Sequence, residues 1–224
     1  MPLQAHGLHR FHRRGDTEVA ALLDVALTCE PGELVAVMGP SGSGKSTLLS
    51  LLAGLDEPDG GQVLLYGALL SHRSPARSAA LRAQHIGILT QGSSLLGHLT
   101  VRENVLLATR IRARARGERF EAARAEDLLD TLGLAGLRHA LPRQLSGGET
   151  ARAGLAVALA GGADVLLADE PTAEVSAAEE ADVLELIQAR RPAHGATVVV
   201  THSPTVAAVA DRIVSLRDGR LVAV

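Results

Sequence analysis

A chain of 224 residues with 46% hydrophobic and 21% charged residues can bury a full core and does not have the composition of a disordered protein. Its formal net charge of −3 argues against general affinity for nucleic acid. No apolar run approaches the roughly 20 residues that span a bilayer, and the N-terminal segment lacks the apolar centre of a signal peptide. The one cysteine, Cys29, excludes an internal disulfide. We therefore expect a globular, cytoplasmic chain.

Short apolar strands alternate with helical runs, which is typical of α/β proteins with a mainly parallel sheet. Buried strands are predicted at 34–39, 86–91, 163–170 and 196–202, and a strand at 61–67 is expected in a small antiparallel layer with the N-terminal segment. Asp218 and Gly219 predict a C-terminal hairpin. Strand patterns are missing from the middle of the chain. We expect one domain, with an α/β core at about 1–91 and 160–224 and an inserted helical subdomain at about 92–159.

The stretch "GPSGSGKST" (39–47) follows a predicted strand and opens a predicted helix, as a phosphate-binding loop must. Its glycines let backbone N–H groups face phosphates, and the helix N-terminus adds its positive end. Lys45 is the only lysine among 22 basic residues, so a plain glycine-serine turn is disfavoured. Lys45 is expected to reach the β- and γ-phosphates, and the Ser46 hydroxyl to bind Mg²⁺. The predicted nucleotide contacts here are Gly39, Pro40, Ser41, Gly42, Ser43, Gly44, Lys45, Ser46 and Thr47.

Polar side chains follow three of the predicted buried strands. Asp169 and Glu170 end the strand "VLLAD", Gln91 follows "IGILT", and His202 follows "ATVVVT". Ligands of open α/β sheets bind at the carboxyl ends of the strands, so we expect these side chains in one crevice. Asp169 is the candidate for holding Mg²⁺, and Glu170 for polarising the attacking water as general base. Gln91 can touch the metal or orient water, and His202 can donate to a γ-phosphate oxygen.

A second candidate anion site is "LSGGE" (145–149), in which Ser146, Gly147 and Gly148 open another predicted helix. The structural alternative is a glycine hinge with an N-cap serine. The residues alone do not explain why one chain would carry two phosphate sites.

Together these motifs, in this order and spacing, resemble the ATP-binding cassette (ABC) ATPases over nearly the whole chain. The resemblance implies a P-loop NTPase (RecA-like) core with an N-terminal antiparallel β subdomain and an inserted α-helical subdomain. It also implies ATP and Mg²⁺ as ligands, ATP hydrolysis as the reaction, and a second ABC ATPase subunit as partner. Two cassettes would pair head to tail, and Ser146, Gly147 and Gly148 would close on ATP held by the partner's Lys45 loop. Whether that dimer is a homodimer or a heterodimer stays open.

Within this family the chain looks like cassettes of the lipoprotein-releasing and macrolide-export type. The segments "LTVRENV" and "LSGGE" carry this closer resemblance. It implies a separate transmembrane permease, export-type transport and a peripheral location on the inner face of the membrane. The surface around Gly92 to Thr100 would receive a short permease helix. Nucleic acid is not an expected partner.

Two positions depart from the family pattern. Val175 and Ser176 stand where the family has Leu-Asp, and the missing aspartate would help to couple the two ATP sites. ATP binding is expected to survive its loss, whereas efficient hydrolysis is not assured. The alternative function is therefore a degenerate or regulatory cassette that binds ATP, hydrolyses little and pairs with an active partner. The family register places His12 against adenine, with Phe11 adjacent; either ring could stack on the base, and we favour His12.

The run "RIRARARGER" (110–119) carries five arginines. We expect a solvated helix face that the acidic segment 121–127 partners. A patch for nucleic acid or lipid headgroups is the alternative.

Overall fold

The computed structural model describes residues 1–14, 17–92 and 94–223. Its centre is a six-stranded sheet with the order β10-β9-β3-β8-β7-β6, in which only β10 runs antiparallel to its neighbour. The strands are β3 (Glu33–Met38), β6 (Ile86–Leu89), β7 (Val165–Asp169), β8 (Ala196–Thr201), β9 (Arg212–Arg217) and β10 (Arg220–Ala223). The predicted parallel α/β core and the hairpin at Asp218-Gly219 are confirmed.

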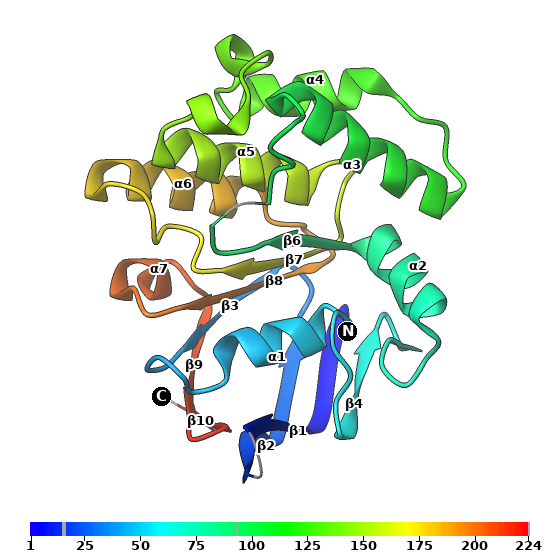
Figure 1. Ribbon diagram of the computed structural model, residues 1–224, viewed down its shortest axis with the longest axis vertical. Coiled ribbons are helices and arrows are strands. Elements are labelled where there is room, and N and C mark those ends of the chain that lie inside the picture. Colours follow the sequence, from blue (N-terminus) through cyan, green and yellow to red (C-terminus); the bar gives the residue numbers. More distant parts are fainter. Residues whose placement is uncertain (15–16, 93, 224) are drawn as a thin grey trace.

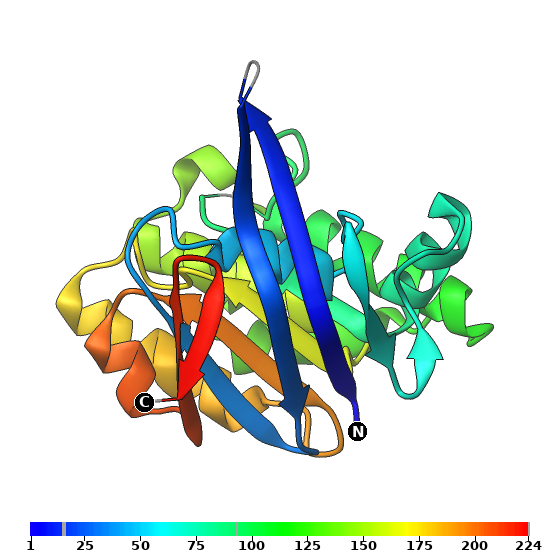
Figure 2. The same cartoon turned by 90° about the horizontal axis from the view of Figure 1, so that it is seen from below.

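A second, antiparallel sheet has the order β2-β1-β4-β5. It consists of β1 (Leu3–Arg14), β2 (Thr17–Cys29), β4 (Gly60–Leu65) and β5 (Ala68–Leu69). The long ribbon of β1 and β2 crosses in front of the central sheet in Figure 2, which shows the molecule from below. The pairing of β4 with β1 confirms the predicted antiparallel layer. Burial raises the pKa of the Cys29 thiol at the end of β2 to about 12.

Alternation along the central strands divides the core into two layers. Val165 and Leu167 of β7 pack with α1 (Lys45–Leu52) and the antiparallel sheet, whereas Leu166 and Ala168 face the opposite side. Because both faces are covered, the strands read as continuous apolar runs. Figure 1 shows α1 on one side of the sheet and α5 and α6 on the other.

The inserted helices form a layer on that second face (Figure 1). They are α3 (Val101–Arg116), α4 (Ala122–Thr131), the 3₁₀ turns Ala135–Leu137 and Pro142–Gln144, and α5 (Gly147–Leu159); α6 (Ala177–Arg190) packs beside α5. Two further helices, α2 (Pro75–His85) and α7 (Pro204–Ala208), flank the sheet. Among the described residues no helix is both long and apolar enough to cross a membrane.

Arg110, Arg114 and Arg119 of the arginine run are exposed, as expected of a solvated face, but Arg112 and Arg116 are not. Arg112 is buried, with 6% of its surface exposed. Its Nε donates to the Ala160 carbonyl at 2.7 Å and its Nη2 to the Ile86 carbonyl at 3.2 Å. Burial lowers the pKa of the Arg112 guanidinium to about 10. The side chain therefore joins the helical layer to the loop before β7 and to the first residue of β6.

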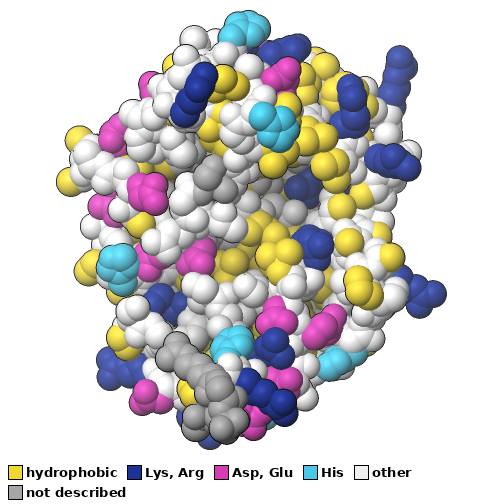
Figure 3. Space-filling view, viewed as in Figure 1, with side chains coloured by type: hydrophobic (Ala, Val, Ile, Leu, Met, Phe, Trp, Pro, Cys, Tyr) yellow, Lys and Arg dark blue, Asp and Glu magenta, His cyan; other side chains and the backbone are white. Residues whose placement is uncertain are grey.

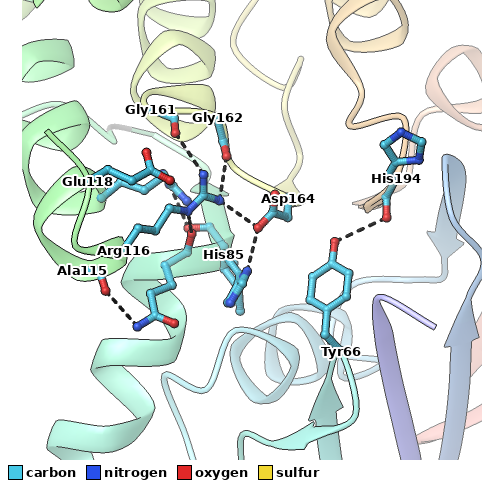
Figure 4. A network of polar contacts seen from close by, with 12 residues as sticks. Tyr66, His85, Ala115, Arg116, Glu118, Gly161, Gly162, Asp164 and His194 are labelled. Atoms are coloured by element: carbon cyan, nitrogen blue, oxygen red, sulfur yellow. Dashed lines mark hydrogen bonds and ion pairs between the residues drawn. The ribbon is translucent and has the colours of Figure 1, made fainter. Parts of the chain in front are cut away.

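Arg116, one turn later, is likewise structural (Figure 4). Its Nε donates to the Gln84 carbonyl at 2.8 Å, and its Nη2 donates to the Gly162 carbonyl and to Asp164 Oδ2. His85 Nδ1 lies 2.6 Å from the same Asp164 oxygen. This network joins the C-terminal ends of α2 and α3 to the end of the sheet where β6 and β7 begin. The predicted site lies at the opposite end, where these strands finish. The expectation of a solvated arginine face is therefore wrong for Arg112 and Arg116.

We expect Arg112→Ala to lower the free energy of unfolding by about 2 kcal/mol, because two buried carbonyls lose their donor. Arg114→Ala is the matched control, since Arg114 is exposed on the same helix and should change stability by less than about 0.5 kcal/mol. Urea denaturation followed by circular dichroism measures both. Equal stabilities of the two variants would contradict a structural role for Arg112.

Candidate functional site

The phosphate-loop motif forms a turn that only glycine can make at two of its positions. Gly44 has φ 102°, and a Cβ there would lie 2.4 Å from the Ala21 carbonyl oxygen of β2. A Cβ on Gly39 would lie 2.3 Å from the Leu216 carbonyl oxygen of β9. The loop is therefore clamped between both sheets, and α1 begins at Lys45 directly after it.

Lys45 is folded back over its own loop. Its Nζ donates to the carbonyl oxygens of Gly39 at 2.8 Å and Pro40 at 3.0 Å. These weak acceptors hold the ammonium at the position where an anion would compete for it. The buried Ser43 hydroxyl, in the same loop, has no hydrogen-bond partner among the described residues.

An open cavity of about 840 Å³ lies above this loop and is large enough for a nucleotide. Of the predicted site residues, His12, Ser41, Gly42, Gly44, Lys45, Ser46, Thr47, Gln91, Asp169, Glu170 and His202 line it. Phe11, Gly39, Pro40, Ser43, Ser146, Gly147 and Gly148 are not among its lining residues. The sequence missed Val19, Ala20 and Ala21 of β2, which close one side. Nothing in their types distinguishes them from ordinary strand residues.

Asp169 faces the phosphate loop because of its place in β7. It shares the face of Val165 and Leu167, the side on which α1 packs. Burial raises the pKa of its carboxyl, whereas a hydrogen bond with Ser46 counteracts that shift. Ser46, Gln91 and Asp169 thus offer oxygen atoms to one cavity, which suits Mg²⁺. The described residues hold no cluster of three or more His, Cys, Asp or Glu side chains that could hold a metal ion.

Glu170 leaves the strand in a left-handed conformation, with φ 47°. Its Oε1 lies 2.7 Å from His202 Nδ1, and its Oε2 accepts hydrogen bonds from Thr201 Oγ1 at 3.0 Å and from the His202 N–H at 3.3 Å. The Glu170 side chain is 11% exposed and that of His202 is 71% exposed. The two predicted catalytic groups are therefore already in contact, with the carboxylate held rigidly and the imidazole free to reach a ligand.

The two candidates for the adenine contact differ in position. His12 lines the cavity, and its Nε2 lies 3.3 Å from Thr47 Oγ1. Phe11 donates its N–H to Asp59 Oδ2 at 2.7 Å and is absent from the lining. Neighbouring residues of a strand point to opposite faces, so only one of them can approach the base. The placement favours His12, which stays a prediction.

The segment "LSGGE" (145–149) has structural roles within its own chain. Ser146 caps α5 in a capping box, where its Oγ accepts the Glu149 N–H at 3.2 Å and its N–H donates to Glu149 Oε2 at 2.8 Å. A Cβ on Gly147 would lie 2.1 Å from the Glu174 carbonyl oxygen, and one on Gly148 would lie 2.4 Å from Glu179 Oε1. Ser146 is therefore an N-cap, as the structural alternative predicts, and both glycines are needed for close packing. This does not exclude a second role.

We expect Asp169→Asn to weaken Mg-dependent ATP binding about tenfold, the effect of losing one charged contact worth about 1.5 kcal/mol. Binding without Mg²⁺ should change little. The nucleotide-free variant should melt at a higher temperature, because an amide is cheaper to bury than the carboxylate. Calorimetric titration with and without Mg²⁺ measures the affinities. Asp182→Asn is the control, because it makes the same change at an exposed position of α6. Unchanged Mg-dependence would remove Asp169 from the metal site.

Comparisons with known proteins agree with this geometry. A family model described as ABC transporter matches residues 22–173. The macrolide export ATP-binding/permease protein MacB of Sodalis glossinidius (strain morsitans) is 42% identical over 222 residues, which are 99% of this chain and 34% of that protein. The MacB of Rhodopirellula baltica (strain DSM 10527 / NCIMB 13988 / SH1) is 42% identical over 218 residues, which are 97% of this chain and 32% of that protein. The chain thus spans about a third of the length of these curated relatives.

One solved structure is described as a dimeric, post-hydrolysis state of the ATP-binding cassette MJ0796 bound to ADP and Pi. It matches with a TM-score of 0.89 and 31% identity, and the match covers 98% of this chain and 96% of that one. The range matched by the family model includes Lys45, Gln91 and Glu170. The chain belongs to the ABC transporter family and is an ATPase cassette of that family.

Proposed function

We propose that this cassette binds Mg-ATP in the cavity above the Lys45 loop and hydrolyses its γ-phosphate. The observation that carries the proposal is the convergence of Lys45, Ser46, Asp169, Glu170 and His202 on a single cavity. They come from α1, the end of β7 and the end of β8, so the fold has gathered phosphate-binding and proton-accepting groups from distant parts of the sequence. Mg²⁺, held from Ser46, Gln91 and Asp169, would neutralise charge on the β- and γ-phosphates.

The residues divide the chemical work. Lys45 exchanges the carbonyls of Gly39 and Pro40 for phosphate oxygens. Glu170 accepts a proton from the attacking water as the water oxygen bonds to the γ-phosphorus and the bond to the bridging oxygen of ADP breaks. His202, mostly exposed, turns its ring towards a γ-phosphate oxygen and donates a hydrogen bond there.

We propose further that two cassettes close head to tail, so that Ser146, Gly147 and Gly148 contact ATP bound to the partner. The position of these residues outside their own chain's cavity supports this arrangement, because they are not needed to form the Lys45 site. A helix N-terminus such as that of α5 favours anions; among the described residues Glu149 occupies its capping box and the Glu179 carboxylate lies beside Gly148. The related cassette MJ0796 is described as dimeric in its ADP- and Pi-bound state, which supports the same arrangement.

We propose that ATP binding and hydrolysis by this cassette drive a separate membrane permease. The cassette would lie on the inner face of the membrane, and transport would run in the export direction. Support comes from the names of the MacB relatives and from exposed hydrophobic side chains at Leu96, Leu107 and Ile111. Figure 3 shows hydrophobic side chains on the surface over α3. The segment from Gly92 to Thr100, the expected docking surface, includes position 93, which lies outside the described residues. Basic and acidic side chains are interspersed over the lower part of the same view, unlike a nucleic-acid surface (Figure 3).

We expect Glu170→Gln to lower ATP turnover at least about 100-fold and to trap an ATP-bound dimer, because a neutral amide cannot take the proton. Its amide oxygen can still accept the hydrogen bonds from Thr201 and His202, so the loop should keep its shape. Light scattering during size-exclusion chromatography in saturating Mg-ATP measures the dimer. The double variant Lys45→Ala/Glu170→Gln, which lacks the phosphate-binding ammonium, should stay monomeric. A monomeric Glu170→Gln with bound ATP would contradict the head-to-tail proposal.

The alternative of a poorly hydrolysing cassette rests on Ser176. In the structure Ser176 is the N-cap of α6, in a capping box with Glu179. Serine, aspartate and asparagine are comparable N-caps, so the residue can be exchanged without removing the cap.

Ser176→Asp therefore tests whether the missing aspartate limits hydrolysis. If it does, the variant should raise kcat severalfold while the melting temperature changes by no more than a few degrees. Ser176→Asn supplies a cap without the charge and should leave kcat unchanged. Efficient turnover by the wild type, with no gain in Ser176→Asp, would dismiss the degenerate-cassette alternative.

A further inference from the structure

Glu180, in the first turn of α6, joins the two chain segments that carry the proposed catalytic pair. Its Oε1 accepts a hydrogen bond from Thr172 Oγ1 at 3.1 Å and another from Ser203 Oγ at 2.9 Å. Thr172 follows Glu170 by two residues, and Ser203 is the neighbour of His202. A single carboxylate oxygen on a helix therefore holds the loops that leave β7 and β8.

The contact continues inward to Glu170. The Ser203 N–H donates to Thr201 Oγ1 at 2.9 Å, and that hydroxyl donates to Glu170 Oε2 at 3.0 Å. Thr201 is fully buried, so its hydroxyl has little alternative to these partners. A continuous series of hydrogen bonds thus runs from Glu180 to the proposed general base.

Glu170, at one end of this series, and His202, the neighbour of Ser203, both need support from outside their own loops. Glu170 has a positive φ, a conformation that costs a non-glycine residue free energy unless its surroundings impose it. His202 is held little by packing, because 71% of its side chain is exposed. The helix after it, α7, has only five residues and starts at the Ser203 cap. The contacts of Glu180 therefore add to the direct hydrogen bonds that join Glu170 to Thr201 and His202.

Glu180 and its neighbour Glu179 are the same residue type but have different hydrogen-bond partners. Glu179 caps its own helix through Ser176 and lies against Gly148. The Oε1 atom of Glu180 instead accepts hydrogen bonds from hydroxyls of two other segments, across 8 and 23 positions of the sequence. Charged acceptors form stronger hydrogen bonds with hydroxyls than neutral ones do.

We propose that Glu180 is a positioning residue for ATP hydrolysis, which fixes the Glu170 and His202 loops relative to each other. This inference rests on the proposed function, because it assumes that these two groups act on ATP. The phosphate loop makes no contact in the series, so Glu180 acts on turnover and leaves nucleotide binding to Lys45.

The test compares Glu180→Ala, Glu180→Gln and Glu185→Ala in the full chain, with steady-state ATP turnover in saturating Mg²⁺. Glu180→Ala should lower kcat about tenfold and leave KM for ATP within about twofold, since misplacing catalytic groups affects the chemical step. Glu180→Gln keeps an oxygen acceptor for both hydroxyls and should retain at least about half of kcat. Glu185→Ala, exposed on the same helix, should behave as wild type.

A general structural effect would instead lower the melting temperature and raise KM together, and Glu180→Gln would not rescue it. If Glu180→Ala does not fold, Ser203→Ala removes one of the same bonds by a smaller change and must lower kcat with KM unchanged. Wild-type turnover in Glu180→Ala, with an active wild type beside it, overturns the positioning role alone. A wild type that binds ATP and shows no turnover overturns the proposed hydrolysis itself, and the positioning role with it.

Discussion

Burial of β7 on both faces sets the direction of the two carboxylates that line the cavity at the end of this strand. Its residues alternate between the α1 layer and the helical layer, so the last position of the strand, Asp169, has to point towards the phosphate loop. The chain then turns through the positive φ of Glu170, which redirects the next carboxylate towards β8 and His202. Two adjacent acidic residues thereby receive different surroundings, one beside Ser46 and one beside an imidazole.

The helical layer is attached to this core by polar as well as apolar contacts. Arg112 and Arg116 extend from the end of α3 to carbonyls near the first residues of β6 and β7. This end of the sheet is remote from the cavity. At the cavity edge, α5 begins with Ser146 and contacts the loop after β7 through Gly147 and the Glu174 carbonyl. Helix α5 therefore ends beside the carbonyls bonded by Arg112 and Arg116, and it begins at the residues that carry the proposed contact with the partner's ATP. A shift of the N-terminal end of α5 would displace the loop that follows Glu170, because Gly147 is in contact with the Glu174 carbonyl.

The sequence predicts what repeats or what matches a motif. Continuous apolar runs indicated four central strands, and glycine spacing located the Lys45 loop correctly. Helix α2 was missed because it presents almost no apolar face; Ser78 is its only buried residue among those described. Arg112 was misassigned for the opposite reason, since its type suggests solvent and only the tertiary structure supplies buried carbonyls. Glu180 also carries no signal, because its partners lie 8 and 23 positions away in separate loops.

The first turn of α6 shows how such a site can change without loss of the fold. Ser176 replaces the aspartate expected from the family pattern, yet it caps the helix through Glu179 as an aspartate would. The stability of α6 is therefore nearly independent of the charge at position 176. Glu180, four residues later, keeps its hold on Thr172 and Ser203 because its position depends only on the helix. Folding and placement of Glu170 thus depend on the cap and on Glu180, whereas coupling to a facing ATP would depend on the missing charge. The two properties are separable in this chain, so an intact cavity and a low rate of hydrolysis are physically compatible.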